Sequence, residues 1–218
     1  MAFRFVIQEL NCRSCDCSRI FKGNQRASPI VEEFGGGVWK GRRAKAAVPG
    51  GLSTGLMTEA EFDTPLDFSA PMRVDCLGLG TACVTVFDET YSMVDFLHNS
   101  CRFFAHESCG QCTPCREGTH WALQMMERIK AGRGRLRDLD LLLEIGDSIG
   151  IIPGTTICGL ADGAAWPLKN AIRKFRGEFE DFIKRTNPQG YMECEPVPAL
   201  VGSSCETASG FQSPIPSP

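Results

Sequence analysis

Three closely spaced cysteines are the residues of this sequence best suited to do chemistry. Cys109, Cys112 and Cys115 lie within residues 107–118, and Cys158 follows in a separate stretch. Thiolates clustered in this way bind soft metals. A Cys-x2-Cys-x2-Cys run with one remote cysteine is typical of a [4Fe-4S] cluster, in which each iron takes one thiolate. The spacing therefore predicts an iron-sulfur centre with these four cysteines as its metal ligands.

Helices are predicted to position these ligands. After Asp88 the apolar residues recur every three or four positions, as on the buried face of an amphipathic helix. Four such helices are expected, at residues 89–105, 115–131, 136–149 and from just before Pro167 to about residue 186. The last start is placed by Pro167, because proline fits the first turn of a helix. Four amphipathic helices with short connections favour an antiparallel bundle. The second and fourth helices then start at one end, which brings Cys158 towards the other cysteines.

Electrostatics favour the same arrangement. The free N–H groups at a helix start carry about half a positive charge, which stabilises thiolates and lowers the pKa of nearby thiols. Gly110 and Gly118 are expected to let the backbone approach the sulfurs. Arg116 either adds a positive charge near the cluster or makes a surface salt bridge, and the sequence leaves both interpretations open.

A structural zinc site is the main alternative for the cysteine motif. Such sites usually repeat a Cys-x2-Cys pair or add histidine ligands. The second pair is missing here, and a ligand at His106 or His120 would leave one motif cysteine unused. Covalent catalysis is not indicated, because no histidine is arranged as a base beside a cysteine, so no catalytic residue is predicted. A non-redox interaction module held together by a metal is therefore the second hypothesis.

Residues 35–88 are predicted to form a small segment of mixed structure. Glycine-rich and proline-containing turns separate two strand candidates, at residues 44–48 and 81–87. Together with the helices at residues 89–186, this segment predicts the α+β class.

The two ends of the chain carry weaker signals. Residues 1–34 contain one short strand candidate and a group of thiols at Cys12, Cys15 and Cys17. Free thiols are the preferred interpretation of this group over part of a second metal site, because no nearby fourth ligand completes a tetrahedral set. Residues 187–218 are rich in proline and serine and are predicted to be a disordered tail.

Composition excludes several classes of function. The 218 residues are 43% hydrophobic and 22% charged, as in globular proteins, and the net charge of −3 offers no basic surface for nucleic acid. The lack of a long apolar run or a signal-peptide start predicts a cytoplasmic protein without direct membrane contact. The sequence has 12 cysteines. In a reducing compartment disulfides are not expected, so the closely spaced cysteines are better interpreted as metal ligands. Cys76, Cys83 and Cys101 are expected to be small buried hydrophobic residues.

The cysteine motif also carries a family resemblance. Residues 107–118 and 156–167 closely resemble the flavoprotein, the NADH-oxidising (F) component of respiratory NADH:quinone oxidoreductase (complex I). The likeness extends back through residues 78–82 and 48–51 and covers roughly residues 35–185. Diaphorase subunits of NAD-reducing hydrogenases and of NAD-dependent formate dehydrogenases share the same motif, so both are alternatives to complex I.

The resemblance implies a division of labour along the chain. In the family an N-terminal domain binds FMN and NADH, a ubiquitin-like (β-grasp) domain follows, and a C-terminal four-helix bundle holds one [4Fe-4S] cluster. Residues 35–88 would be all or part of the ubiquitin-like segment, and residues 89–186 the bundle. Cys109, Cys112, Cys115 and Cys158 match the four ligand positions. Single electrons would pass from FMN through this cluster.

The resemblance also implies partners and a location for the protein, and it indicates which functional residues this chain lacks. The expected partners are the other hydrophilic subunits of complex I, especially the small [2Fe-2S] subunit and the large iron-sulfur subunit, on the inner face of the membrane. Residues 1–34 do not resemble the glycine-rich flavin loop or the residues that bind NADH. We therefore expect a fragment of an NADH dehydrogenase flavoprotein, with no FMN or NADH ligand in this chain and no NADH oxidation by the chain alone.

Overall fold

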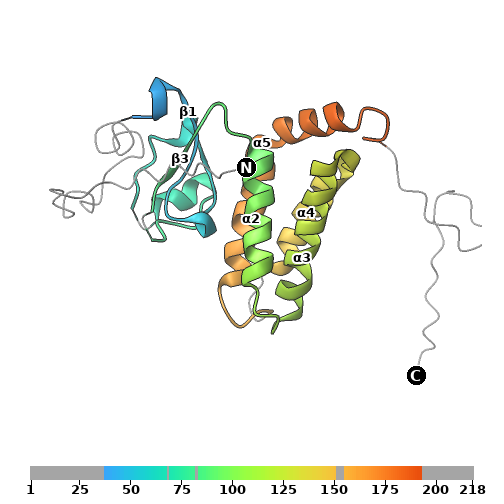
Figure 1. Ribbon diagram of the computed structural model, residues 1–218. Coiled ribbons are helices and arrows are strands. Elements are labelled where there is room, and N and C mark those ends of the chain that lie inside the picture. Colours follow the sequence, from blue (N-terminus) through green and yellow to red (C-terminus); the bar gives the residue numbers. More distant parts are fainter. Residues whose placement is uncertain (1–36, 68, 82, 151–154, 193–218) are drawn as a thin grey trace, which may run out of the picture.

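The computed structural model describes residues 37–67, 69–81, 83–150 and 155–192 (Figure 1). In these residues a small antiparallel sheet precedes four α-helices, which agrees with the expected α+β class. The strands are β1 (Ala44–Val48), β2 (Met57–Thr58) and β3 (Thr85–Asp88), and the helices are α2 (Met93–Glu107), α3 (Thr113–Arg128), α4 (Leu136–Ile149) and α5 (Leu160–Thr186). The predictions for residues 1–34, for Cys12, Cys15 and Cys17, and for the tail beyond residue 192 lie outside the described residues.

The sheet has the strand order β2-β1-β3, with both pairs antiparallel. Strand β1 is central, and its Ala47 pairs with Met57 on one side and with Val86 on the other. The strand predicted at residues 44–48 is confirmed. Because β1 is bordered on both edges, its last three residues are buried, as their small and β-branched side chains allow.

The strand predicted at residues 81–87 is confirmed only in its second half. The Thr81 N–H donates to the Gly50 carbonyl at 2.9 Å, and the Gly51 N–H donates to the Cys83 carbonyl at 3.0 Å. These bonds pair Thr81 and Cys83 with the glycine turn after β1, and the sheet pairing of β3 begins only at Thr85. A side chain at Gly50 would meet the Leu79 carbonyl oxygen at 1.8 Å, which explains why this close approach uses glycine.

Helices α2, α3 and α4 follow the hydrophobic period closely. Helix α4 has the predicted bounds, α3 starts two residues earlier than predicted, and α2 starts four residues later. The later start has a local cause. The Asp88 carboxylate accepts from the Thr90 N–H at 2.9 Å, which makes a turn there, and Ser92 then caps the helix through the Asp95 N–H.

Helix α5 corrects the prediction made from Pro167. The helix begins at Leu160, so the proline lies in its interior and not in its first turn. An interior proline costs roughly 3 kcal/mol. Close packing of small buried residues offsets this cost: Ala161 and Ala165 are almost fully buried, and a side chain at Gly163 would meet Ser53 Oγ at 2.8 Å. The bend in α5 occurs later, at the non-helical residue Phe175, and gives the two arms seen in Figure 1.

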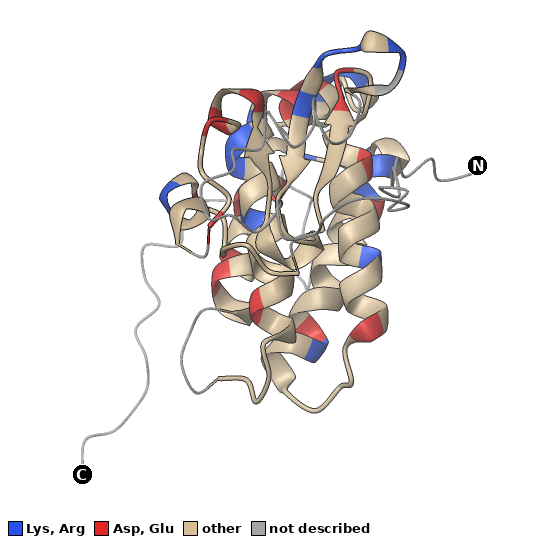
Figure 2. Ribbon diagram, turned by 90° about the vertical axis from the view of Figure 1, so that its left-hand side faces the viewer, with Lys and Arg blue, Asp and Glu red and all other residues tan. Residues whose placement is uncertain are grey.

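One hydrophobic core joins the sheet to the helices. The same cluster of buried side chains contains Val48 and Phe87 from the strands and Leu97, Leu168 and Ile172 from α2 and α5. Charged residues are intermixed on the outside (Figure 2), where salt bridges such as Lys45–Glu178, at 2.6 Å, join the sheet to α5. Among the described helices, none combines the length and hydropathy required to cross a bilayer.

Two polar side chains of α5 fasten the sheet segment to the helices. Fully buried Asn170 accepts from the Leu56 N–H at 2.7 Å and donates to the Asp75 carbonyl at 2.7 Å. Lys174 Nζ donates to the Leu56 carbonyl at 2.8 Å and also contacts Glu61 at 2.7 Å. The middle of α5 is thereby held at a defined position relative to the sheet segment.

Replacing Asn170 with alanine is expected to lower the free energy of unfolding by about 2–4 kcal/mol. The change leaves the buried Leu56 N–H without its acceptor and opens a small cavity. Denaturant unfolding followed by far-UV circular dichroism measures the loss. The matched control is Asn99→Ala on α2, whose amide oxygen accepts from the exposed Arg102 side chain at 3.2 Å. Equal stability of the two variants would contradict this role of Asn170.

Candidate metal centre

The four predicted ligands line one cavity. Cys109, Cys112, Cys115 and Cys158 surround a space of about 90 Å³ at the end of the helices where α3 and α5 start. Its remaining lining residues are Glu107, Ser108, Gln111, Thr156, Leu160 and Ala161. Figure 1 shows these two helix starts at the same, lower end. The structure therefore brings together the cysteines that the sequence singled out.

The loop between α2 and α3 positions the first three cysteines. Cys112 occupies the residue before α3, and its carbonyl accepts from the Arg116 N–H at 2.9 Å in the first turn. Gly110 has φ of 80°, a left-handed conformation that suits glycine and turns the loop between Cys109 and Cys112. Cys115 lies inside the helix and is buried, with 7% exposure.

Arg116 makes the surface salt bridge, one of the two roles that the sequence left open, and also supports the cysteine loop. Its Nε donates to Glu117 at 2.8 Å, which is a surface salt bridge, and its NH1 group donates to the Gly110 carbonyl at 2.8 Å. The second bond ties the cysteine loop to the first turn of α3. Arg116 does not line the cavity. We therefore interpret it as a residue that holds the loop in shape.

Two hydrogen-bond donors face the sulfurs. The Ile157 N–H donates to Cys112 Sγ at 3.3 Å, and Ser108 Oγ lies 3.3 Å from Cys115 Sγ. Once Cys115 is a thiolate it has no proton to give, so the hydroxyl must be the donor. Hydrogen bonds to cluster sulfurs are one of the means by which proteins adjust the reduction potential. The motif did not reveal either donor, although Ser108 directly precedes it.

Gly118 has a different role from the one expected. It was predicted to let the backbone approach the sulfurs, yet its nearest neighbours lie on α4. A side chain there would meet Ile149 Cγ2 at 1.8 Å. Gly118 therefore allows α3 and α4 to pack closely, one turn after Cys115. The sequence could not identify this neighbour, because the contact depends on how the two helices cross.

The donor set fits an iron-sulfur cluster. Within the described residues, no three His, Cys, Asp or Glu side chains are placed to share one metal ion. A [4Fe-4S] cube does not require such convergence, because each thiolate binds a different iron. His106 pairs with Glu107 and His120 contacts the Arg116 carbonyl, and neither histidine lines the cavity. The ring of the cavity is thus four cysteines with sulfur-directed donors, the ligand chemistry of a cluster.

The single cysteines differ in burial. Cys76 and Cys101 are buried as expected, and burial raises the pKa of Cys76 to about 11 and that of Cys101 to about 12. Cys83 is exposed, so the expectation that it is buried is wrong. The reason is that Thr81 and Cys83 pair with the glycine turn, so Cys83 lies before the sheet pairing of β3 begins.

The rate of alkylation should distinguish the exposed thiol from the two buried ones. At pH 8 we expect iodoacetamide to label Cys83 at least tenfold faster than Cys76 or Cys101, because only thiolates react and the raised pKa keeps the buried pair protonated. Peptide mapping by mass spectrometry measures each rate. In 6 M guanidinium the three rates should become similar. Fast labelling of Cys101 in the folded chain would contradict its assigned burial.

Comparison with known proteins identifies relatives of this region. Residues 95–182 match the family model described as the NADH-ubiquinone oxidoreductase-F iron-sulfur binding region. The F-type subunit of NADH-quinone oxidoreductase in Streptomyces coelicolor is 42% identical over 151 residues, covering 69% of this chain and 33% of the relative. Its counterpart in Mycobacterium bovis is 44% identical over 147 residues, covering 67% of this chain and 32% of the relative. The chain thus spans about a third of the length of these curated relatives.

A solved structure resembles the fold. An NAD⁺-reducing [NiFe]-hydrogenase in the H₂-reduced state superposes with a TM-score of 0.64 and 28% sequence identity. The alignment covers 78% of this chain and 26% of the hydrogenase chain. The similarity therefore includes both the sheet segment and the helices.

Proposed function

We propose that this chain, a homologue of the NADH-quinone oxidoreductase F-type subunits whose residues 95–182 belong to the iron-sulfur binding region of that family, is an electron-transfer module. It would hold one [4Fe-4S] cluster on Cys109, Cys112, Cys115 and Cys158. A bound cluster supplies reversible one-electron chemistry. The observation that supports this proposal most strongly is the single cavity lined by all four thiols.

The residues around the cavity would have distinct parts in this function. The four thiolates bind the irons, and the starts of α3 and α5 offset their negative charge. Ser108 and the Ile157 N–H would stabilise charge on two of the sulfurs. Cys115 is buried whereas Cys109 and Cys158 are exposed, so the site lies at the surface, where an electron donor or acceptor can come close.

The family suggests the wider context. In the whole protein, NADH oxidation at FMN would deliver electrons to this site. The small [2Fe-2S] subunit and the large iron-sulfur subunit would be neighbours, on the inner face of the membrane. Residues 35–88 would correspond to the ubiquitin-like β-grasp segment, residues 89–186 to an antiparallel four-helix bundle, and residues 187–218 to a tail. We expect the isolated chain to be unable to oxidise NADH, because hydride chemistry belongs to the flavin.

A diaphorase component of an NAD-reducing hydrogenase or formate dehydrogenase is the second candidate. The likeness to the hydrogenase structure supports it, at 28% identity, and the 42% and 44% identity to the two complex I relatives favours complex I. Affinity purification from the native host separates them. Complex I predicts recovery with quinone-reductase subunits, and the alternative predicts recovery with a nickel-containing or formate-oxidising subunit.

Metal analysis tests the cluster directly. The chain purified without oxygen should contain about four irons and four acid-labile sulfides, as a four-thiolate cube requires. Dithionite should produce a paramagnetic signal at low temperature, whereas NADH alone should not. Stoichiometric zinc without sulfide would overturn the proposal and favour the non-redox interaction module, in which a metal only joins the helices.

A further inference from the structure

The hydroxyl of Ser108 is directed at one ligand sulfur of the cysteine cavity. Its Oγ lies 3.3 Å from Cys115 Sγ, and Ser108 lines the cavity. Among the described lining residues, the other hydroxyl is that of Thr156, which donates to the Cys158 carbonyl at 3.4 Å and not to a sulfur. Ser108 therefore presents a side-chain donor whose partner is a metal ligand.

The fold fixes both partners of this contact. Ser108 caps the C-terminus of α2, where its N–H donates to the carbonyl of buried Phe104 at 3.1 Å. On α3, buried Thr119 donates its hydroxyl to the Cys115 carbonyl at 2.8 Å. The hydroxyl and the sulfur are thus held by two helices that pack on the core, so their contact does not depend on the exposed part of the cysteine loop.

The end of α2 makes this donor electrostatically important. A helix C-terminus carries about half a negative charge, which disfavours further negative charge beside it. Helix α2 ends at Glu107, which also lines the cavity, and its carboxylate contacts His106 Nδ1 at 2.9 Å. The Ser108 hydroxyl directs a hydrogen at a sulfur in these surroundings. Its effect is strengthened by the exclusion of water, because Cys115 is only 7% exposed.

The second sulfur-directed donor lies in a more hydrated place. The Ile157 N–H donates to Cys112 Sγ at 3.3 Å, but Ile157 is 81% exposed. Water can replace a hydrogen bond of this kind at small cost. A buried acceptor that loses its donor has no such replacement. We therefore expect the Ser108 hydroxyl to affect the centre more than the Ile157 N–H does.

We propose that Ser108 is a positioning residue that raises the reduction potential of this centre by donating a hydrogen bond to the Cys115 sulfur. The inference rests on the proposed function, because it requires a cluster on the four cysteines. One-electron reduction adds one negative charge to the thiolate-bound centre, and the Ser108 proton stays on its oxygen. A donor at a ligand sulfur stabilises the more negative state more strongly, so its loss makes reduction harder.

Redox titration of Ser108→Ala measures this effect. The full chain is purified without oxygen and titrated with dithionite in the presence of mediator dyes, and the reduced fraction is followed by low-temperature electron paramagnetic resonance. At a fixed potential we expect the ratio of reduced to oxidised centre to be at least threefold lower than in the parent. For one electron, at 59 mV per tenfold, this is a shift of about 28 mV to lower potential. An unchanged or higher potential overturns the inference.

Ser108→Thr and Ser108→Val separate the hydroxyl from the shape of the side chain. Threonine and valine have nearly the same shape, and only threonine can donate. The threonine variant should keep the parent potential, whereas the valine variant should resemble Ser108→Ala. Equal potentials for the two would overturn the inference. If the alanine and valine variants assemble no cluster, retention of iron by the threonine variant supports the hydroxyl contact, and loss of iron from all three variants overturns it.

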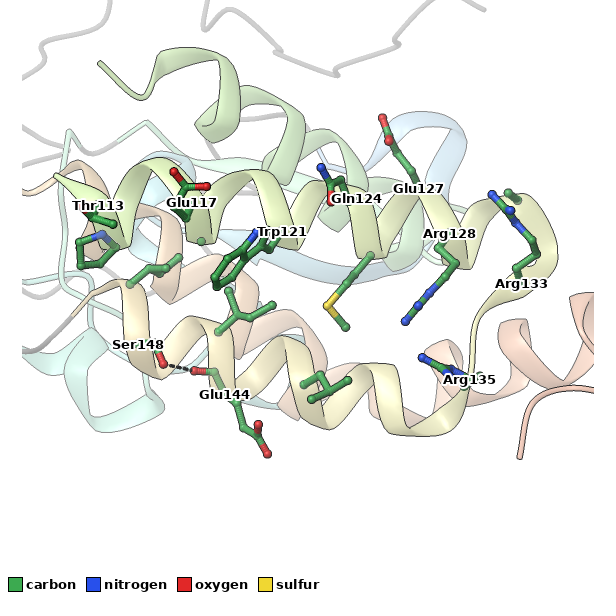
Figure 3. A pocket seen from close by; sticks show the side chains of 17 residues that line it. Thr113, Glu117, Trp121, Gln124, Glu127, Arg128, Arg133, Arg135, Glu144 and Ser148 are labelled. Atoms are coloured by element: carbon green, nitrogen blue, oxygen red, sulfur yellow. Dashed lines mark hydrogen bonds between the residues drawn. The ribbon is translucent and has the colours of Figure 1, made fainter. Parts of the chain in front are cut away.

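Ser148→Ala is the matched control for losing a serine hydroxyl. Ser148 lines a separate groove of about 1060 Å³ between α3 and α4, and its Oγ donates to the Glu144 carbonyl at 2.8 Å (Figure 3). This variant should keep the parent potential. A shift as large as that of Ser108→Ala would overturn the inference, because contact with a sulfur would then be unnecessary.

The parent chain distinguishes failure of this inference from failure of the proposed function. A parent without iron and labile sulfide would overturn both. A parent that holds a reducible cluster, with the same potential in Ser108→Ala, would overturn only the role of Ser108.

Discussion

Loss of at least one iron per chain is expected when Cys158 is replaced by alanine. The other three thiolates come from one loop and the first turn of α3, and only Cys158 reaches the cavity from the start of α5. A cube that loses one of its four protein ligands exposes one iron to exchange. Iron should fall from about four to three or fewer, and the dithionite-reduced signal should change or disappear.

The control for this experiment is Cys83→Ala. Among the described cysteines, Cys83 is exposed and does not line the cavity, so its removal tests the effect of losing a surface thiol. That variant should keep its iron, its labile sulfide and its reduced signal. Iron and sulfide analysis with low-temperature electron paramagnetic resonance measures both variants. A Cys158→Ala protein with four irons and an unchanged signal would exclude Cys158 as a ligand.

A stability loss of about 1–3 kcal/mol or more is expected from Gly118→Ala. The added methyl group would lie 1.8 Å from Ile149 Cγ2, so α3 and α4 must separate. Because Gly118 follows Cys115 by less than one turn, the same movement should displace a ligand. We therefore expect slower reconstitution of the cluster in addition to a lower free energy of unfolding, measured by denaturant titration.

A double-mutant cycle identifies the cause. Ile149→Ala removes the atom that clashes, at a cost of about 2–5 kcal/mol by itself. If the clash dominates, adding Gly118→Ala to that variant should cost at least about 1 kcal/mol less than adding it to the parent. Gly177→Ala on α5 is the matched control, because nothing lies within 4 Å of the added atom and alanine favours helix. A strictly additive cycle would show that the contact with Ile149 is not responsible.

Sequence patterns predicted the helices well, because each helix has a buried face. The bounds of α4 were predicted correctly, and the starts of α2 and α3 were missed by a few residues. The start of α5 was placed too late, because Pro167 alone is a strong signal for a first turn. The packing of Ala161, Gly163 and Ala165 against distant residues overrides that signal. Contacts between residues distant in the sequence cannot be predicted from the local pattern of residue types.

The cysteine motif by itself determined which residues can form the centre, because thiolates at this spacing have few other uses. It could not give the groups that surround them. Ser108, the Ile157 N–H and the Gly110 carbonyl bound by Arg116 act through distances and directions that depend on the folded loops. The exposure of Cys83 was missed for the same reason, since its carbonyl pairs with a turn far away in the sequence.

The sequence alone therefore predicted the chemistry of this protein, and the tertiary structure decided its geometry. Residue types and their local spacing are enough to predict the ligand residues, the helices and the proline- and serine-rich tail. Only the packed chain brings the starts of α3 and α5 to one end, places Gly118 against Ile149 and opens a groove between α3 and α4. The physical reason is that these contacts join residues distant in sequence, and their close packing depends on the whole fold.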